Sequence, residues 1–358
     1  MEYVYLDTAL LAVPNYAIDG NSAQELIDRV LHFSDVASAP SDIPLRLVIS
    51  SMTEDTLWSV HHGPERDQIA EFMDLMEISD YYSANDLLRS YNTILDRASR
   101  SADLCGVEIT AFNNFSVDPQ LDQALAPANL ANETQRILLN VAVLNQLEGG
   151  WSVGSSLSGG TCTLYEVGAD VTDATGAQAE MAGELPSRHV GGAYLVPRVD
   201  ALAGSAEQVW TRASSDQEIH FAITLGAIAL RRAAGLNSEL SSLKRFRLGP
   251  LLVDSLTEHG CCGGGKFSSA TRLLLTQLVA GLCGREVGTF GRPQQKVRNF
   301  DGAKASRVHL TEGKLGLRLM FWTVGEDIEF ANIGVKKALE IAVGAKDDFI
   351  ELDLVKVL

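Results

Sequence analysis

The sequence predicts an α/β N-terminal domain with a parallel sheet, joined to a mixed α+β C-terminal domain with a small antiparallel sheet. Apolar strands alternate with helical segments early in the chain, and short strands with tight turns follow near its end. A reversal of charge between these parts is the third observation. We expect an acidic α/β domain over 1–147, a Gly/Ser-rich insert or connector with short strands over 148–203, and a helical region leading into a basic α+β domain over 204–358.

The beginning of the chain has the order strand, helix, strand, helix that opens a parallel sheet. A strand over 3–8 is followed by a helix capped by Asn21 or Ser22. A second buried strand over 45–50 leads into a short helix that begins near Thr53.

Further elements are predicted along the rest of the chain. Between 148 and 203 the composition shifts toward Gly and Ser, which predicts only isolated short strands. Elsewhere the pattern predicts two helices over 65–101, a strand over 105–112, and helices over 130–147, 204–235 and 268–282.

Three short strands are predicted within 296–334. Their apolar and polar side chains alternate, which indicates a sheet with one packed face and one open face. The apolar set is Val308, Leu310, Leu317, Leu319 and Phe321, and the alternating set is His309, Arg318 and Met320. Turn residues at 312–314 and 325–327 separate the strands.

Charge is distributed unevenly in this chain, whose formal net charge is −17. Residues 1–230 carry 10 Lys and Arg against 32 Asp and Glu, whereas residues 231–320 carry 15 against 6. A basic segment in an acidic chain indicates a polyanionic partner or internal charge pairing. The five cysteines show no CxxC spacing, and no apolar run suggests a signal peptide or membrane span, so we expect a cytoplasmic protein without membrane contact.

Acidic residues follow both N-terminal strands, at the edge where parallel sheets carry functional loops. Asp7 ends the first strand, and Glu54 and Asp55 follow the second. Carboxylates that meet there are suited to hold Mg²⁺ or Mn²⁺ for phosphodiester hydrolysis, because hard cations prefer oxygen ligands. The structural alternative is that Asp7 caps a loop while Glu54 and Asp55 favour a helix N-terminus.

The same residues carry a resemblance to a known family. The run MEYVYLDTALL and, after the helix, LVISSMTEDTLW resembles the opening of PIN-like nuclease domains. The resemblance implies a catalytic metal site at Asp7, Glu54 and Asp55. Ala9 stands where the family usually has asparagine, and further acids are available at Asp103, Glu108 and Asp118.

A second resemblance lies in the basic segment. Residues 303–334, AKASRVHLTEGKLGLRLMFWTVGEDIEFANIG, are similar to the core of RelE-like ribonuclease toxins. The resemblance implies that Arg307, Lys314 and Arg318 hold the substrate phosphate and that His309 is catalytic, with no metal required. The chain ends without the aromatic or histidine that many such toxins use, and the alternative is a solvated face whose arginines pair with acidic residues.

A glycine-rich turn, GCCGGGK over 260–266, precedes the last predicted helix and has the spacing G-x4-G-K. Phe267 follows where a nucleotide-binding loop has Ser or Thr, which argues against an NTPase. The amides of the turn, with Lys266, are a candidate site for a nucleic-acid phosphate. The alternative is a flexible turn.

Together these features predict a protein that acts on nucleic acid, of the toxin-like or antiviral phage-defence nuclease kind, cleaving phosphodiester bonds in RNA or DNA. The alternative is a non-catalytic scaffold or a nucleic-acid-binding subunit of a multi-protein complex. Mg²⁺ or Mn²⁺ is the cofactor expected for the first hypothesis. RNA or DNA is the expected partner in both, with protein partners added in the second.

Overall fold

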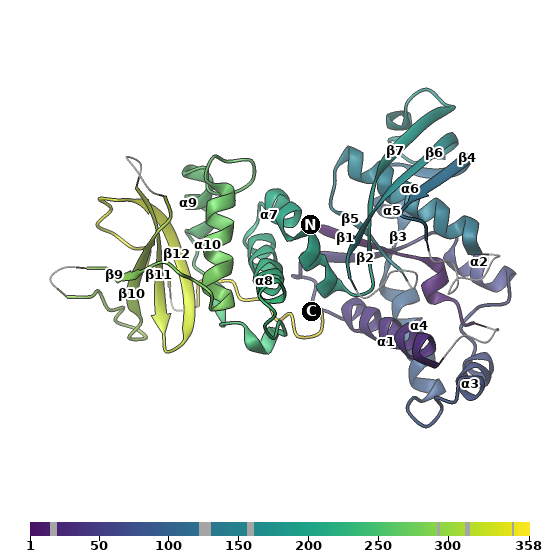
Figure 1. Cartoon of the computed structure of the whole chain (residues 1–358), viewed down its shortest axis with the longest axis horizontal. Coiled ribbons are helices and arrows are strands. Elements are labelled where there is room, and N and C mark those ends of the chain that lie inside the picture. Colours follow the sequence, from purple (N-terminus) through teal and green to yellow (C-terminus); the bar gives the residue numbers. More distant parts are fainter. Residues whose placement is uncertain (15–19, 122–129, 156–160, 292–293, 312–315, 346) are drawn as a thin grey trace.

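The computed structural model describes residues 1–14, 20–121, 130–155, 161–291, 294–311, 316–345 and 347–358. Its strands form two sheets, one mostly parallel and one mostly antiparallel, with a layer of helices between them (Figure 1). The mixed α/β class predicted from the sequence is confirmed at this level. No helix among these residues is long and apolar enough to cross a membrane.

The N-terminal sheet has seven strands in the order β3-β2-β1-β5-β7-β6-β4. The strands are β1 (Glu2–Leu6), β2 (Leu45–Ile49), β3 (Ser99–Arg100), β4 (Glu108–Asp118), β5 (Trp151–Gly154), β6 (Thr163–Thr175) and β7 (Ser187–Val196). The first five in the spatial order are parallel to their neighbours, and β6 and β4 add an antiparallel edge. Central β1 therefore brings its carboxyl end, where Asp7 follows, to the middle of the sheet.

Two parts of this sheet differ from the sequence prediction. The segment expected as an insert or connector, 148–203, instead supplies β5, β6 and β7 to the main sheet. Strand β5 has only four residues and lies between glycine-rich stretches, so the sequence does not indicate that it is a central strand. In the structure it is buried along its whole length. The third parallel strand is the two-residue β3, whereas the predicted strand over 105–112 belongs to antiparallel β4 at the far edge.

Helices cover both faces of the N-terminal sheet (Figure 1). Val4 and Leu6 of β1 pack into the core that includes α1 and α4, whereas Tyr5 between them packs into the core that includes α6. This alternation follows from the period of two along a strand. The helices are α1 (Gly20–Ala37), α2 (Thr53–Ser59), α3 (Arg66–Leu75), α4 (Ala84–Arg97), α5 (Ser101–Leu104) and α6 (Ala131–Leu147).

The helical layer between the sheets is built around α8 (Asp216–Ala233), which is buried over residues 219–228. Ser215 and Glu218 cap its start reciprocally, and Glu218 also pairs with the amino group of Met1. Beside it, Arg212 lies 2.7 Å from the carboxylate of Glu2. These contacts tie the helical layer to β1. The other helices here are α7 (Ala206–Arg212), α9 (Leu252–Glu258) and α10 (Ser268–Ala280), with short turns η5 (Val199–Ser205) and η6 (Leu240–Ser242).

The C-terminal sheet has five strands in the order β8-β12-β11-β10-β9. They are β8 (Phe246–Leu248), β9 (Val287–Thr289), β10 (Lys304–His309), β11 (Leu317–Val324) and β12 (Asp327–Val335). The three strands expected within 296–334 are confirmed as the antiparallel set β10, β11 and β12. Gly325, with a φ of +62°, begins the two-residue turn between β11 and β12, a position that favours glycine.

The two faces of this sheet differ, although less sharply than predicted. Val308, Leu319 and Phe321 pack into the core shared with α9 and α10, as expected for the packed face. On the opposite face, Met320 and Trp322 are also buried, because residues of 338–342 cover that end of the sheet. The face predicted to be open is therefore open only at the end that carries His309 and Arg318. We call this face, opposite the helices, the outer face.

The C-terminal segment, residues 349–358, connects the two halves. Ile350 and Leu248 of β8 exchange both backbone hydrogen bonds at 2.9 Å, and Leu352, Leu354 and Val357 are buried in the main core. Figure 1 shows the chain end between α8 and α1. One hydrophobic core consequently extends from the N-terminal helices to the C-terminal sheet.

Candidate nucleic-acid interface

Asp7 is fully buried at the carboxyl end of β1. Its Oδ1 accepts hydrogen bonds from the Ala9 amide at 3.1 Å and from Thr134 Oγ1 of α6 at 2.9 Å. Its Oδ2 accepts from Ser155 Oγ, just after β5, at 3.2 Å. Burial raises the pKa of Asp7 to about 6, against the opposing effect of these three donors.

A polar network continues from this aspartate along the edge of the sheet. Arg136 of α6 lies 2.5 Å from Glu133 and 3.5 Å from Glu108, and it donates to Ser50 Oγ at 2.7 Å. Thr8 Oγ1 lies 3.5 Å from the Glu133 carboxylate and links the network to the Asp7 loop. The two carboxylates in this network are thus neutralised by one arginine that is itself mostly buried.

The three carboxylates of the predicted metal site, Asp7, Glu54 and Asp55, do not gather around one point. Glu54 of α2 pairs with Arg100, and Asp55 is exposed on the same helix. In the described ranges, no group of three His, Cys, Asp or Glu side chains is placed to hold a metal ion, so Asp7, Glu54 and Asp55 do not come together. A single buried carboxylate without further ligands from the described residues does not fit Mg²⁺ or Mn²⁺, which require several oxygen ligands. Asp7 instead caps η1 (Thr8–Leu11), which matches the structural alternative.

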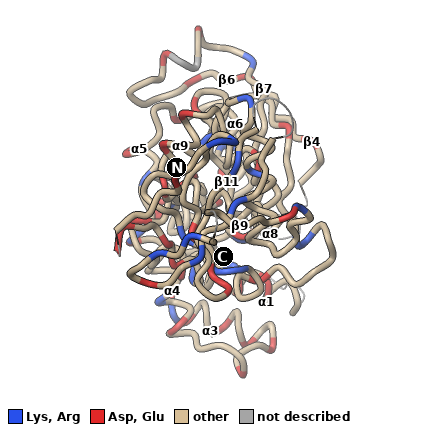
Figure 2. The backbone as a smooth tube through the Cα atoms, turned by 90° about the vertical axis from the view of Figure 1, so that its left-hand side faces the viewer, with Lys and Arg blue, Asp and Glu red and all other residues tan. Residues whose placement is uncertain are grey.

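Cationic side chains gather at the open end of the outer face. His309 of β10 is paired directly with Arg318 of β11, and Arg307 lies two residues earlier on the same face. Partial burial lowers the pKa of His309, and the charges of Arg318, Lys336, Arg307 and Arg285 lower it further. We call Arg285, Arg307, His309, Arg318 and Lys336 the cation cluster. Figure 2 looks onto this side of the molecule, with Lys and Arg in blue near β9 and β11.

Uncharged groups accept the hydrogen bonds of two arginines in the cluster. Arg285 Nη1 donates to the carbonyl oxygens of His309 at 2.7 Å and Leu310 at 3.1 Å. Arg318 Nη1 donates to the Lys336 carbonyl oxygen at 3.1 Å, and its Nη2 lies 3.4 Å from His309 Nε2. These contacts orient the guanidinium groups without cancelling their charge. Arg318 Nε is buried and lacks a hydrogen-bond partner within the described part of the chain.

Other arginines of the basic segment behave differently, because acids of the same half neutralise them. Glu329 of β12 lies 2.5 Å from Arg298 and 2.7 Å from Arg247, and Asp301 lies 2.6 Å from Arg298. Internal charge pairing, one of the two explanations offered for the basic segment, therefore accounts for these arginines. It does not account for Arg285 and Arg318, whose hydrogen-bond acceptors are neutral.

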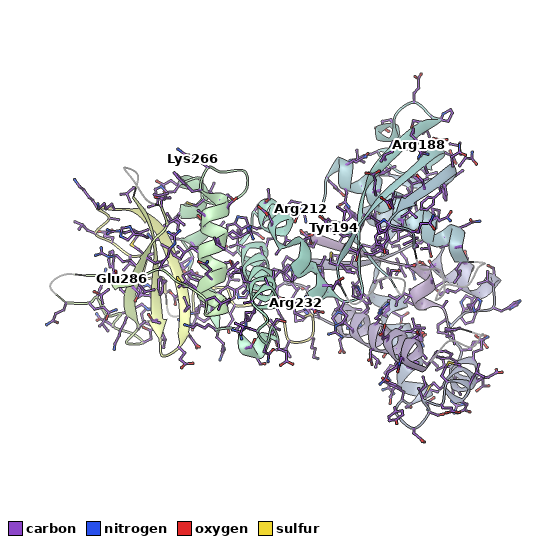
Figure 3. The ribbon with its side chains drawn as sticks, in the orientation of Figure 1. Arg188, Tyr194, Arg212, Arg232, Lys266 and Glu286 are labelled. Carbon is purple, nitrogen blue, oxygen red and sulfur yellow. The ribbon has the colours of Figure 1, made fainter. Side chains whose placement is uncertain are left out.

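Of the two remaining predicted phosphate-binding lysines, Lys266 lies away from the cluster. Lys266 is exposed on the loop before α10, in the helical layer on the opposite side of the sheet from the outer face (Figure 3). Amides of that loop are already used: Gly265 donates to the Cys262 carbonyl and Phe267 to the Gly260 carbonyl. These two amides of the glycine-rich turn are therefore not available to bind a phosphate. Lys314 lies outside the described residues.

The cation cluster and the Asp7 network both include residues that were not predicted from the sequence. Arg285 and Lys336 lie outside the segment that carried the resemblance, and they reach the cluster from the flanks of the sheet. Thr134, Ser155 and Glu133 reach the Asp7 network from elements far along the chain. Hydroxyl side chains are too common to mark a site by spacing, although Glu133 in the first turn of a helix is a recognisable signal.

Comparisons with protein-family models, with curated proteins and with solved structures find no match.

Proposed function

We propose that this protein binds RNA or DNA, with the phosphate backbone held by the cation cluster on the outer face. The observation that carries the proposal is that four cationic side chains surround His309, while Arg285 and Arg318 donate to neutral groups within the described part of the chain. Because no described acidic side chain accepts a hydrogen bond from these two arginines, their positive charge is not cancelled. The cluster therefore offers fixed positive charge to a bound anion.

The geometry suits a phosphodiester chain. Guanidinium groups bind phosphate oxygens with charge-assisted hydrogen bonds, often through two parallel N–H donors. The cluster spans three sources along one end of the sheet: the segment before β9, paired strands β10 and β11, and the residue after β12. Cations spread over a surface in this way contact successive phosphates and bind with little sequence preference.

The net charge of the whole chain does not oppose this binding. Helices α9 and α10 lie between the C-terminal sheet and the acidic N-terminal half (Figure 1). The cluster lies on the face of the sheet turned away from those helices, so the acidic half is separated from it by the helical layer. Charges beyond about one Debye length, roughly 8 Å at physiological salt, are largely screened.

A second candidate function is cleavage of RNA at the same cluster. Since Arg318 can only donate, its contact makes His309 Nε2 the acceptor and leaves the ring neutral. When Arg318 turns to the substrate phosphate, the Nε2 lone pair is released and can take the proton of a 2′-hydroxyl, while that oxygen attacks phosphorus and the 5′-oxygen leaves with a proton from solvent. The neighbouring cations would stabilise the charge that develops on the phosphate. The metal-dependent route through Asp7 is not proposed, because no further ligands from the described residues gather around this carboxylate.

The proposal is tested by fluorescence anisotropy with labelled single-stranded RNA, single-stranded DNA and duplex DNA. Arg318→Ala should weaken binding roughly tenfold, because it removes a charged donor at the centre of the cluster. Arg89→Ala is the matched control, since Arg89 is an exposed arginine on α4 that pairs with Asp86, and it should change affinity less than about twofold. No binding by the wild-type protein, or equal losses in the two variants, would refute the proposal.

Cleavage is read from the same mixtures on a denaturing gel, with EDTA present. RNA cut to products ending in a cyclic phosphate, and lost in His309→Asn, would support the second candidate. Binding without cleavage would leave the non-catalytic subunit predicted as the alternative.

A further inference from the structure

An acidic surface lies on the opposite side of the molecule from the cation cluster. Residues 54–86, which include α2 and α3, carry nine Asp and Glu but one Lys or Arg, Arg66. Helix α3 lies on the side of the N-terminal domain that is turned away from the C-terminal sheet, and the helical layer lies between them (Figure 1). The acidic surface of a molecule therefore does not reach its own cation cluster.

Three acids of α3 form a row along its exposed side. Asp67, Glu71 and Asp74 follow the spacing i, i+4, i+7, which places them on one side of the helix, and the buried apolar residues occupy the other side. We call these three residues the acidic stripe. The Cβ atoms of neighbours in such a row are about 5–6 Å apart. The stripe is thus a fixed series of negative charges, as a phosphate backbone is.

Within the described residues, the acidic stripe is weakly neutralised. Asp67 lies 3.1 Å from Arg66, but both side chains are exposed, so this pair contributes little. Asp74 accepts a hydrogen bond from Ser79 Oγ at 2.6 Å, and that donor is neutral. The acidic stripe consequently keeps its negative charge for a cationic partner.

The cation cluster complements the acidic stripe in charge. Arg285 and Arg318 donate to backbone carbonyl oxygens, so their charge is not cancelled, and Lys336 is exposed on the same sheet. Opposite charges arranged in matching patches orient two proteins and accelerate their association. Two copies with a net charge of −17 repel each other at long range, but charges more than about 8 Å apart are largely screened at physiological salt. Attraction between patches in contact therefore decides whether two copies associate.

We propose that, in the absence of nucleic acid, the acidic stripe of one copy of this chain docks on the cation cluster of a second copy. The contact is head-to-tail, so each pair keeps one unused surface at either end, to which further copies can add. RNA or DNA would compete with this contact for the same cations. The competition rests on the function proposed above, whereas the self-association does not.

The test is sedimentation velocity of the full chain without nucleic acid. At about 0.1 M salt the average mass of the wild-type protein should rise with protein concentration, and at about 1 M salt, where the Debye length is roughly 3 Å, it should return to that of the monomer. Two double variants each remove one surface: Arg318→Ala, Lys336→Ala in the cluster and Glu71→Gln, Asp74→Asn in the stripe. Each alone should associate at least about tenfold more weakly than the wild-type protein.

Mixing the two double variants gives the sharpest result, because each keeps the surface that the other lacks. The mixture should form pairs but no longer chains. A wild-type protein that stays monomeric at every concentration, or a mixture that stays monomeric, would overturn the proposal.

RNA binding separates this contact from the proposed function. Glu71→Gln, Asp74→Asn should bind labelled RNA at least as tightly as the wild-type protein, and RNA should return wild-type chains to monomers. Self-association that follows the pattern above in a protein that binds no RNA would leave this contact standing while the proposed function fails. RNA that binds without dissociating the chains would refute the competition.

Discussion

Arg318 Nη2 lies 3.4 Å from His309 Nε2, across the directly paired positions of β10 and β11. An arginine stays protonated at any ordinary pH, so this contact holds the imidazole as a neutral acceptor. The outer face consequently combines fixed positive charge with one titratable ring. That combination has consequences for affinity, for pH dependence and for the choice between binding and cleavage.

Nucleic-acid affinity should increase as the pH falls from about 7 to about 5. In the free protein, partial burial and the neighbouring cations lower the pKa of His309, whereas a bound phosphate would raise it. Binding is therefore coupled to proton uptake, and uptake is favoured at low pH. Anisotropy titrations across this range would measure the effect. His309→Asn should flatten the profile, and a variant that keeps the full pH dependence would contradict this assignment.

Lys336→Ala should weaken nucleic-acid binding about three- to tenfold, because it removes one phosphate-facing charge. Lys337→Ala is a matched control: the side chain is also exposed and adjacent in sequence, but Lys337 is not among the charges that act on His309. Its effect should stay below about twofold. If both substitutions reduce affinity equally, the cluster has no special role and only overall charge matters.

Asp7→Asn should stabilise the protein at pH 8. The pKa of Asp7 is raised from its usual 3.8 to about 6, so its contribution to stability is complete below 3.8 and is lost as the pH rises through about 6. The loss at pH 8 is about 3 kcal/mol. Asn keeps an oxygen for the Ala9 amide and Thr134, and its amide can donate to Ser155.

Urea unfolding at several pH values would measure this gain, which should shrink toward pH 4. A destabilising effect of Asp7→Asn at pH 8, or a difference that does not change with pH, would contradict the account of Asp7 as a buried group with a raised pKa.

Glu329→Gln should destabilise the protein by about 3–5 kcal/mol, because among the described residues it leaves two arginines with Asp301 as their single acidic partner. Arg298 is almost fully buried, and it shares Glu329 with Arg247. Glu351→Gln breaks the exposed pair with Arg245 and should cost less than about 1 kcal/mol. Chemical unfolding of both variants gives the comparison, and similar losses would show that burial of the Glu329 network adds nothing.

The sequence predicted what depends on local period and turn chemistry. The helix of α1, the strand that ends at Asp7 and the alternation through β10 and β11 follow from residue spacing, which sets which side chains share a face. The prediction that Val308, Leu319 and Phe321 lie on the packed face of the C-terminal sheet is confirmed, because alternate side chains of a strand share one face and the apolar ones are buried there.

What depends on long-range packing was not predicted. The four-residue strand β5 takes a central place only because β1 and β7 pair with it, and its glycine-rich surroundings conceal that role. Likewise, Glu54 pairs with Arg100, and Thr134 and Ser155 reach Asp7 from far along the chain, and neither contact can be read from local spacing. Met320 was expected on an open face, yet residues of 338–342 cover it.

The salt dependence of nucleic-acid binding tests the central claim most directly. Affinity for single-stranded RNA would be measured over a series of salt concentrations, for the wild-type protein and for the double variant Arg318→Ala, Lys336→Ala. Each phosphate contact contributes about 0.7 to the slope of log affinity against log salt for a single strand. The account predicts a steep wild-type slope that falls by about 1.4 in the double variant. A slope near zero, or an identical slope in both proteins, would contradict phosphate binding by the cation cluster.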